Sequence, residues 1–514
     1  MSHVVESQEP VFALLADPAT HGGSPVKRID THAASVFLVG DRALKVKRAV
    51  RFPFLDFSDA HKRRAACQAE LDANRPFAPD IYRRVVPITR EDDTRLAIGG
   101  RGAPVDWAVE MRRFDETATL DHLAEAGRID LALAEELGRA VSAGHRAAPI
   151  IEPRPWIEAL ASFIEQNDAE FRETPDLFPP PAVAALSAAS RNAFARIRPL
   201  LAARGQIGLV RRGHGDLHLG NIVLIDGKPV LFDALEFDPL IAAGDVLYDL
   251  AFLLMDLLER DLGEAANVVL NRYLSDARRE ADLDGLASLP LFLSLRAAIR
   301  AKVTAARLEQ SEGPKRAGIE HHAKVYFDLA CRLIAPRPPT LVAVGGLSGT
   351  GKSVLARRLA PGLPPAPGAV VLRSDVERKV MFGCAEEKLL PSDAYATAVT
   401  ERVYATLSDK AARVIAAGHS TVVDAVFSKP AERLAGTSIA RAANVAFQGL
   451  FLTADLDTRL QRIGRRTADA SDADAAVARQ QEQFDLGAMD WACIDAGGTP
   501  EETVRAATAA LSGR

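Results

Sequence analysis

The spacing of apolar and polar positions divides the chain into two parts. After residue 340, short apolar runs rich in β-branched residues alternate with stretches whose apolar positions recur every three or four residues. The short runs predict buried strands, and the longer stretches predict helices. The expected strands cover 341–344, 369–372, 421–423, 445–452 and 492–495. This alternation is typical of an α/β fold with a parallel, doubly wound sheet.

The first part has strands early and helices late. Alternation with a period of two predicts strands, and three- to four-residue periodicity predicts helices. The expected strands lie within 35–47, 81–89 and 106–113, and the expected helices cover 58–74, much of 120–201 and one long run over 291–333. A later hairpin is expected over 222–232, around the turn Asp226-Gly227. This order indicates a two-lobed α+β unit.

A proline-rich segment separates the two parts. Residues 334–340 read IAPRPPT, and three prolines in four positions neither continue a helix nor fill a central strand. We therefore expect a first domain over 1–335, with lobes of about 1–113 and 114–335. A linker over 336–339 then leads into a second domain over 340–514.

Composition excludes several classes of protein. With 514 residues, 48% of them hydrophobic and 25% charged, the chain is long enough for two to four packed domains and is not mostly disordered. Its four cysteines form no C-x-x-C pair, and the first ten residues do not resemble a secretory signal. The most apolar stretch, 246–258, is short and contains Asp249 and Asp256, so we expect a cytoplasmic protein without a membrane partner.

One motif in the second part indicates phosphate binding. The stretch from Gly346 to Ser353, GLSGTGKS, fits G-x-x-x-x-G-K-[ST] and lies between a predicted strand and a predicted helix, which argues against an ordinary glycine turn. Backbone N–H groups of such a loop converge on the phosphates of ATP, and Lys352 would reach the β- and γ-phosphates. The Ser353 hydroxyl would bind Mg²⁺. The loop residues expected to contact the nucleotide are Gly346, Ser348, Gly349, Thr350, Gly351, Lys352 and Ser353.

The second part also resembles small P-loop kinases of the polynucleotide kinase, gluconate kinase and zeta-toxin types. Ser374–Arg378 matches their S-D-x-x-R motif, and the strand 421–423 ends at the carboxylate of Asp424. The resemblance implies that Asp375 orients or deprotonates the acceptor hydroxyl and that Arg378 binds the substrate or the transferring phosphate. It also implies that Asp424 holds Mg²⁺ through water. An aspartate before a helix is also a common N-cap, so Asp375 has this structural alternative.

The arginines of RLQRIGRRT, residues 459–467, resemble the lid that closes over the phosphates in the same kinases. Fixed cations in a lid offset the charge of the phosphoryl group being transferred. Among Arg459, Arg462, Arg465 and Arg466, we expect Arg462 and Arg466 to be catalytic. The alternative is a solvated helix face.

The first part contains a second kinase motif. His214–Asn221, HGDLHLGN, resembles the H-G-D-x-x-x-x-N catalytic loop of aminoglycoside and choline phosphotransferases, relatives of the protein kinases. The resemblance implies that Asp216 accepts the proton of the attacking hydroxyl and that Asn221 holds a magnesium ion. Asp233 follows a predicted strand at the place of the metal-binding aspartate of D-F-G.

Upstream residues fit the same scheme. Lys45 follows an apolar strand, as the phosphate-contacting lysine should, while Lys47 lies on the same strand face and is the alternative. Glu70 is the expected ion-pair partner of this lysine, and Glu236 either assists the metal or faces the acceptor. The chain departs from protein kinases at 31–35, where the loop expected to cover the nucleotide has no glycine.

Taken together, the chain resembles bacterial fusions called bifunctional aminoglycoside phosphotransferase/ATP-binding proteins. This implies a two-lobed, protein-kinase-like fold followed by a P-loop domain with a parallel sheet. We expect an ATP- and Mg²⁺-dependent phosphotransferase that phosphorylates a hydroxyl of a sugar, amino sugar or amino alcohol, with a second P-loop kinase site. In the alternatives, one part is a nucleotide sensor, or the P-loop part phosphorylates a nucleotide, polynucleotide or sugar nucleotide. The net charge of −5 argues against nucleic acid, and nothing indicates an oligomeric state or a choice between ATP and GTP.

Overall fold

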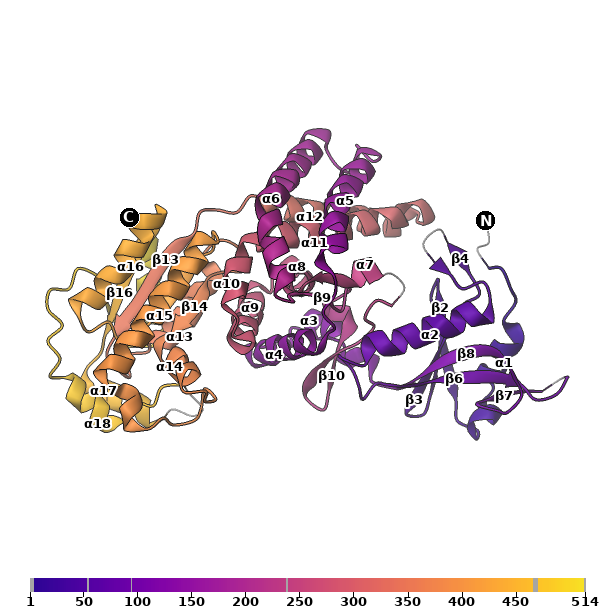
Figure 1. The fold of residues 1–514 in the computed structure, drawn as a ribbon, viewed down its shortest axis with the longest axis horizontal. Helices are drawn as coiled ribbons and strands as arrows, with labels where there is room; N and C mark the ends of the chain where they lie inside the picture. The colour runs from indigo at the N-terminus through magenta and orange to yellow at the C-terminus, as the bar shows by residue number, and fades with distance from the viewer. Residues whose placement is uncertain (1–3, 53–54, 94, 237–238, 466–469, 513–514) are drawn as a thin grey trace. The chain divides into compact units, whose positions relative to one another are not determined.

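The computed structural model describes residues 4–52, 55–93, 95–236, 239–465 and 470–512 (Figure 1). The chain packs into two compact units. The first consists of Met1–Phe163 and Arg198–Asp256, and the second consists of Ile164–Ile197 and Leu257–Arg514. The predicted linker at 336–339 stays a prediction; helix α12 ends before it at Ile334, and strand β13 begins after it at Thr340.

A six-stranded antiparallel sheet of order β1-β2-β3-β8-β6-β7 forms the first part of unit 1. Its strands are β1 Val26–Asp30, β2 Ala34–Val39, β3 Arg42–Lys47, β6 Tyr82–Arg90, β7 Leu96–Ile98 and β8 Ala103–Arg112. Helix α2, Ala60–Asn74, begins after the N-cap Asp59, whose carboxylate accepts a hydrogen bond from the Lys62 N–H. It packs on β6 and β8 and buries Cys67 and Leu71. The predicted strands and the predicted helix are confirmed here.

The later part of unit 1 is mainly helical. The expected hairpin is present, with Asp226 and Gly227 both at positive φ (51° and 76°), as a two-residue turn of this kind requires. The other elements of this region are α1 Glu9–Ala16, α3 Leu120–Glu125, α4 Leu131–Ala147, β9 Val210–Arg212, β10 Ile222–Ile225, β11 Lys228–Leu231, α7 Pro239–Ala242, β12 Ala243–Asp245 and α8 Val246–Glu259. Two longer helices, α5 Pro153–Arg172 and α6 Pro180–Gln206, complete the predicted helical region over 120–201.

The single long helix expected over 291–333 is wrong. The region forms two helices, α11 Leu289–Ala305 and α12 Gly313–Ile334, after α9 Gly263–Ala277 and α10 Glu280–Gly285. Helix α11 ends at Ala305, a 3-10 turn follows over Ala306–Gln310, and α12 begins only at Gly313, whose φ of 57° is left-handed, with Pro314 next. The helices pack antiparallel, and the Ser294 hydroxyl donates to the Ala330 carbonyl. None of the helices in the described residues is long and apolar enough to cross a membrane.

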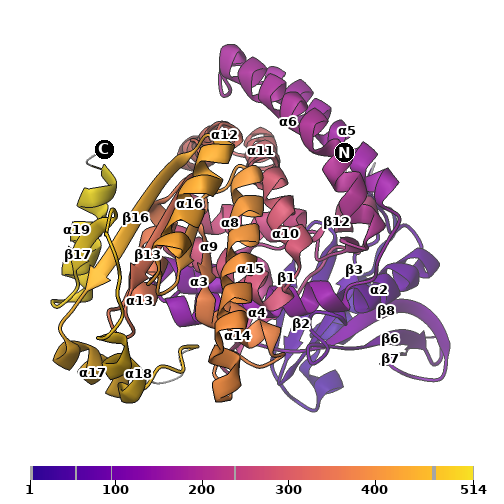
Figure 2. The same cartoon turned by 60° about the vertical axis from the view of Figure 1, so that its left-hand side comes forward.

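A five-stranded parallel sheet of order β14-β15-β13-β16-β17 occupies the end of unit 2. Its strands, β13 Thr340–Gly346, β14 Val370–Arg373, β15 Thr421–Asp424, β16 Ala446–Thr453 and β17 Ala492–Asp495, match the five predicted ones. Helices α13 Lys352–Leu359 and α19 Pro500–Ser512 cover one face, and α15 Thr397–Ala416 and α16 Pro430–Ala443 cover the other (Figure 2). The carboxyl ends of β13, β14 and β15 therefore meet at one edge, where open α/β sheets bind ligands.

Candidate active sites

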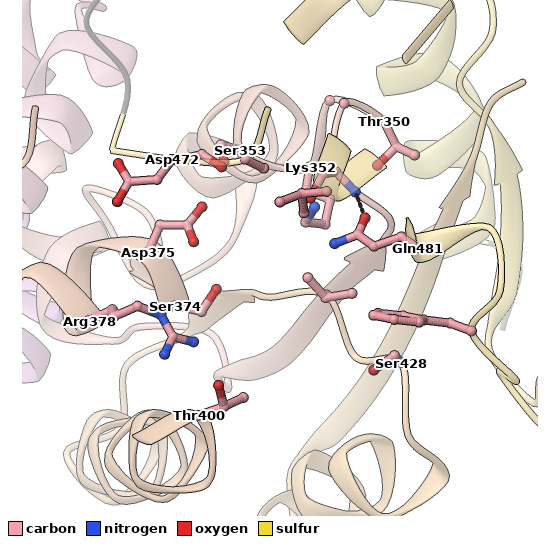
Figure 3. A pocket seen from close by; sticks show the side chains of 18 of the residues that line it. Thr350, Lys352, Ser353, Ser374, Asp375, Arg378, Thr400, Ser428, Asp472 and Gln481 are labelled. Carbon is pink, nitrogen blue, oxygen red and sulfur yellow. Dashed lines mark hydrogen bonds between the residues drawn. The ribbon is translucent and has the colours of Figure 1, made fainter. Parts of the chain in front are cut away.

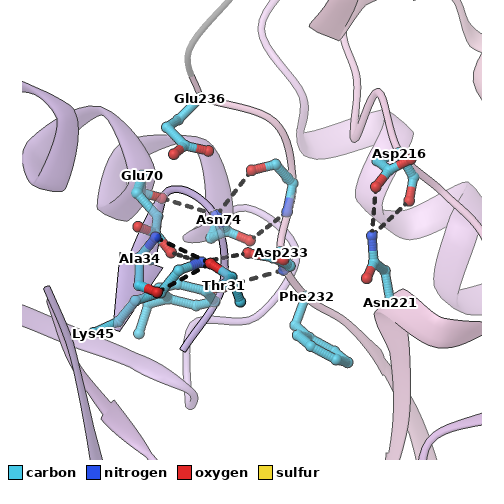
Figure 4. Close-up of polar contacts among 12 residues, drawn as sticks. Thr31, Ala34, Lys45, Glu70, Asn74, Asp216, Asn221, Phe232, Asp233 and Glu236 are labelled. Carbon is cyan, nitrogen blue, oxygen red and sulfur yellow. Dashed lines mark hydrogen bonds and ion pairs between the residues drawn. The ribbon is translucent and has the colours of Figure 1, made fainter. Parts of the chain in front are cut away.

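In unit 1, strand β3 and helix α2 bring two lysines to one buried glutamate, and Figure 4 shows one of them, Lys45, beside Glu70. Lys45 and Lys47 share a face of β3 because side chains alternate along a strand. The Lys45 Nζ lies 2.8 Å from Glu70 Oε1, and the Lys47 Nζ lies 2.7 Å from Glu70 Oε2. The predicted partner of the lysine therefore contacts both candidates.

The second partners distinguish the lysines. Lys45 Nζ lies 2.7 Å from Asp233 Oδ1, whereas Lys47 Nζ lies 2.5 Å from Glu236 Oε1. The side chain of Lys47 is only 3% exposed, compared with 16% for Lys45. Lys47 is therefore enclosed between two carboxylates, and Lys45 faces the predicted metal ligand. Glu236 Oε1 contacts Lys47, and a role of Glu236 at the metal or the acceptor stays a prediction.

These contacts hold the cluster in its charged form. Burial disfavours the ammonium of Lys45, but Asp233 and Glu70 outweigh it and raise the pKa of Lys45 well above its usual value. Burial likewise opposes ionisation of Glu70, yet the two lysines lower the pKa of Glu70. Lys45 also lowers the pKa of Asp233 against the cost of removing that carboxylate from water. The cluster is thus a fixed set of charges at neutral pH.

Asp233 lies just after β11 with a φ of 61°, a left-handed conformation that aspartate tolerates better than most residues. Its N–H donates to the Tyr82 hydroxyl, at 3.1 Å. The next N–H, of Ala234, donates to Asn74 Oδ1 at 2.8 Å. Asn74 lies one turn after Glu70 on α2, so one helix holds both the lysine and the backbone beside Asp233. The sequence analysis did not identify Tyr82 or Asn74.

The HGD loop is held by a second aspartate. Asp249 accepts hydrogen bonds from the N–H groups of His214 and Gly215, at 2.7 and 2.9 Å. Gly215 has a φ of 80°, and a Cβ there would lie 3.0 Å from Ala242 Cα. Only glycine fits this conformation easily, which explains why it stands where a protein kinase has arginine.

Within this loop, Asp216 and Asn221 lie side by side (Figure 4). Asn221 Nδ2 donates to the backbone oxygen and to Oδ2 of Asp216, each at 3.0 Å. This orientation leaves the amide oxygen of Asn221 without a protein partner among the described residues. The Asp216 side chain is 35% exposed, so an acceptor can reach it.

The loop between β1 and β2, which lacks glycine, is closed by a threonine. The Thr31 hydroxyl donates to the carbonyl oxygen of Ala34 and accepts from its N–H, both at 3.0 Å. These two bonds shape the turn locally, as side chains of this type do in other turns.

In unit 2, the phosphate-loop motif joins β13 to α13, as predicted. Gly346 and Gly349 have φ values of 140° and 88°. A Cβ on Gly346 would lie 2.7 Å from the carbonyl oxygen of Leu452, and one on Gly349 would lie 2.7 Å from that of Arg459. Both positions therefore require glycine for conformation and for space.

The loop opens into a cavity of about 640 Å³ (Figure 3). The predicted residues that line it are Ser348, Gly349, Thr350, Gly351, Lys352, Ser353, Asp375, Arg378 and Arg462. This volume is in the range of small-molecule sites. One cavity therefore brings together the loop, the S-D-x-x-R motif and one lid arginine.

Two strand ends and the first turn of α13 form a polar cluster. The Ser353 hydroxyl donates to Asp424 Oδ2 at 2.6 Å. Arg373, the last residue of β14, donates from Nη2 to Ser353 Oγ at 3.0 Å and from Nε to Asp424 Oδ2 at 3.3 Å. The predicted magnesium ligands are thus adjacent, and Arg373, which the sequence analysis missed, contacts both.

Asp375 is not the N-cap of its helix. Helix α14, Ser374–Met381, has Arg373 at its N-cap, and Asp375 lies in the first turn. Burial and the nearby Asp424 raise the pKa of Asp375, and Lys352 and Arg373 oppose this only in part. A raised pKa in a cavity is typical of a proton-accepting carboxylate.

Arg378 has a different environment from a surface arginine. It is 7% exposed, its Nη1 donates to the Ala394 carbonyl at 2.6 Å, and its guanidinium lies 4.8 Å from the ring centre of Tyr395. No carboxylate pairs with it among the described residues. A buried cation without a counter-charge favours an anionic ligand.

The four lid arginines have different places. Arg459 is buried, and its Nε donates to the Ser348 carbonyl at 2.8 Å while it pairs with Glu482, so it holds the phosphate loop from behind. Arg462 donates to the Gly498 carbonyl at 2.8 Å and lines the cavity. Arg465 is exposed, and Arg466 lies outside the described residues.

The sequence analysis also missed Gln481 of α18, Ala475–Gln481. Its Oε1 accepts from the Ser348 N–H at 2.7 Å (Figure 3). No sequence motif marks Gln481, because its contact with the phosphate loop depends on how α18 and the other late helices pack. Arg373 had a possible signal, since it directly precedes the S-D-x-x-R motif.

Two families match separate stretches of the chain. Residues 35–286 match the phosphotransferase enzyme family known as APH, and residues 341–486 match an AAA domain family. An uncharacterized protein of Mycobacterium tuberculosis strain H37Rv is 31% identical over 492 residues, which cover 92% of this chain and 93% of the relative. An uncharacterized protein of Mycobacterium bovis matches to the same extent.

Solved structures resemble each part separately. A choline/ethanolamine kinase family protein from Mesorhizobium loti is 15% identical and covers 63% of this chain and 98% of its own, with a TM-score of 0.39. A gluconokinase from Sinorhizobium meliloti 1021 is 21% identical and covers 34% of this chain and 94% of its own, with a TM-score of 0.25. On its sequence matches, the chain belongs to the family of the two mycobacterial proteins, with an APH-type kinase-like domain followed by a P-loop kinase-type domain.

Proposed function

We propose that the protein is an ATP- and Mg²⁺-dependent phosphotransferase with two sites, each of which transfers the γ-phosphoryl group to a hydroxyl of a small molecule. The observation that carries this proposal is the same in both units. A lysine, oxygen ligands suited to a divalent cation and a separate carboxylate lie close together, and phosphoryl transfer requires these three items.

In unit 1, Lys45 would bind the nucleotide phosphates, with Glu70 holding its ammonium in place. Asp216 would accept the proton of the acceptor hydroxyl, since its carboxylate is partly exposed and oriented by Asn221. Asp249 keeps the loop rigid through two backbone N–H groups. Such preorganisation is the main contribution that a protein makes to this kind of reaction.

In unit 2, the loop from Ser348 to Ser353 would bind the phosphates, with Lys352 at its end. Asp375 would accept the proton of the acceptor, which its raised pKa supports. Arg378 would bind an anionic part of the acceptor or the phosphoryl group itself. Arg462 would offset phosphate charge from the lid side, and the same role for Arg466 stays a proposal.

The chemistry of the donor sets fits magnesium. Mg²⁺ prefers oxygen ligands and keeps several waters. In unit 1 the unpartnered amide oxygen of Asn221 and the carboxylate of Asp233 would hold it. In unit 2 the hydroxyl of Ser353 and the carboxylate of Asp424, 2.6 Å apart, would do so. Bound magnesium neutralises phosphate charge in reactions of this type.

The lining of the cavity in unit 2 supports a polar acceptor such as a sugar, amino sugar or amino alcohol. Hydroxyl-bearing residues lie opposite the phosphate loop, namely Ser374, Tyr395, Thr397, Thr400, Tyr404 and Ser428. Such groups bind polyhydroxy molecules through hydrogen bonds. A need for ATP also supports the predicted cytoplasmic location, and we propose no nucleic-acid or membrane partner.

The test is an ATP-consumption screen over a panel of sugars and amino alcohols. Wild type is compared with Asp216→Asn and Lys352→Ala, and Asp226→Asn in an exposed turn and Lys315→Ala on α12 serve as controls. We expect two acceptor-dependent activities, of which each site variant loses one while the controls keep both. If one site variant keeps full turnover and loses only a response to nucleotide, that site is a sensor. If neither changes ATP use with any acceptor, the proposal is wrong.

A further inference from the structure

Strand β14 lies at one edge of the five-stranded sheet, so one row of its backbone groups has no strand partner. Helix α9 covers this edge (Figure 1). The Asn271 side chain accepts a hydrogen bond from the Val371 N–H at 2.7 Å and donates to the Ala369 carbonyl at 3.1 Å. One side-chain amide therefore replaces the two bonds that a neighbouring strand would make.

A second asparagine strengthens the contact. Asn267, one turn earlier on α9, donates from Nδ2 to the same Ala369 carbonyl at 3.0 Å and is 2% exposed. The approach is close because residue 368 is glycine, where a Cβ would lie 2.7 Å from Asn267 Nδ2. The edge of β14 is thus sealed against α9.

Helix α9 also holds the loop that follows α14. Arg272 Nη1 and the Ser275 hydroxyl both donate to Glu386 Oε1, at 2.9 and 3.0 Å. Burial opposes ionisation of Glu386, but Arg272, Ser275 and Arg373 outweigh it and lower the pKa of Glu386. The charges of Arg272 on α9 and of Arg373 at the P-loop site therefore both stabilise the Glu386 carboxylate.

The strand that α9 covers leads directly into that site. Four residues after Ala369, Arg373 contacts the Ser353 hydroxyl and the Asp424 carboxylate. Two residues later, Asp375 lines the cavity. Helix α9 lies inside the stretch matched by the phosphotransferase family, yet it packs within unit 2 beside the P-loop sheet.

We propose that α9 is a positioning element of the P-loop site. Asn271 fixes the outer edge of β14 and Arg272 fixes Glu386. These contacts hold Arg373 and Asp375 in place beside the phosphate loop. This inference rests on the proposed function of unit 2. The P-loop site is then completed by a helix from the preceding kinase-like sequence. The hydrogen bonds described for α9 reach Ala369, Val371 and Glu386 rather than residues 346–353, so we expect turnover to respond more than nucleotide binding when α9 is altered.

The test uses the full chain with Asn271→Leu, which keeps the approximate shape of the side chain but removes both its acceptor and its donor, and with Arg272→Gln. The control is Arg413→Gln on α15, which loses ion pairs with Glu280, Asp284 and Asp409, none of which lies in β14. Hydrogen exchange is followed at the Val371 amide, and turnover is expressed per bound ATP. That normalisation and the local exchange rate separate positioning from a general loss of folded protein.

In Asn271→Leu we expect exchange at Val371 to be about tenfold faster, because the Val371 amide loses its one hydrogen bond to Asn271. Lys352-dependent turnover per bound ATP should fall by about the same factor, with the KM for ATP within about twofold of wild type. Arg272→Gln should lower turnover without accelerating Val371, and Arg413→Gln should change neither quantity.

Unchanged exchange at Val371 in Asn271→Leu overturns the inference, as does faster exchange with unchanged turnover per bound ATP. Equal effects of Arg413→Gln on exchange at Val371 and on turnover also overturn it, because the loss of any contact between helices of unit 2 would then explain the results. If wild type binds no ATP through Lys352, the proposed function fails, and the exchange rate at Val371 still decides whether α9 holds the strand.

Discussion

Replacing Gly349 with alanine tests how the phosphate loop is shaped. Gly349 has a φ of 88°, and left-handed conformations cost a residue with a Cβ about 1–2 kcal/mol. The new Cβ would also lie 2.7 Å from the carbonyl oxygen and 2.9 Å from the Cβ of Arg459, where ordinary contacts begin at 3.4 Å. Arg459 is itself fixed by Ser348 and Glu482, so it cannot easily move away.

The two costs can be separated with a control. Gly418 also has a left-handed φ, 76°, but a Cβ there would meet no atom within 4 Å. Gly418→Ala therefore carries only the conformational cost, whereas Gly349→Ala adds an overpacking cost of about 1–3 kcal/mol. Because the loop relieves this clash by shifting, the cost appears as lost affinity for ATP, roughly 5- to 150-fold.

The assay is isothermal titration calorimetry with ATP and magnesium, in a background in which Asp233→Ala disables the site in unit 1. We expect Gly418→Ala to bind ATP like its parent and Gly349→Ala to bind it at least about fivefold more weakly. Equal affinity in the two variants would refute the reasoning that the contact with Arg459 fixes the loop.

Three further predictions follow from the charges of the two sites. Burial and the nearby Asp424 raise the pKa of Asp375, so this carboxylate takes up a proton at a higher pH than an ordinary aspartate does. We therefore expect the activity of unit 2 to decline on acidification at that higher pH, because the base form of Asp375 is lost. A pH–rate profile measures this. Lys47→Met removes the Lys47 partner of Glu236 and leaves the buried Glu70 with Lys45 alone, and it should lower stability by about 3–5 kcal/mol, measured by denaturant unfolding. Lys45→Met should weaken ATP binding in unit 1 more than Lys47→Met does, because only Lys45 contacts Asp233; equal losses of affinity would contradict this.

Much of the fold was predictable because the strands of unit 2 are short, apolar and rich in β-branched residues. All five predicted strands are present and parallel. The helix over 291–333 was wrong because its apolar periodicity continues across Gly313-Pro314, although this dipeptide is a recognised breaker. A left-handed glycine followed by a proline does not lie inside a helix, even where the apolar periodicity continues across it.

The site was predictable where the chemistry lies within a motif. Lys352 and Ser353 follow from the spacing of the phosphate-loop motif, and Asp216 and Asn221 follow from the resemblance of HGDLHLGN to a kinase catalytic loop. The structure brings Lys45, Glu70 and Asp233 together. Residues such as Asn74 and Gln481 were missed because they contact the sites through tertiary packing between distant elements. The buried place of Arg459 was missed for the same reason, since a run of arginines does not reveal which one turns inward.

The central claim is that one chain contains two separate nucleotide sites, and counting bound ATP tests it most directly. Equilibrium dialysis with ATP and magnesium should give two molecules per wild-type chain, one in Lys352→Ala, one in Asp233→Ala and none in the double variant. A single molecule per wild-type chain, abolished by either substitution alone, would contradict the account.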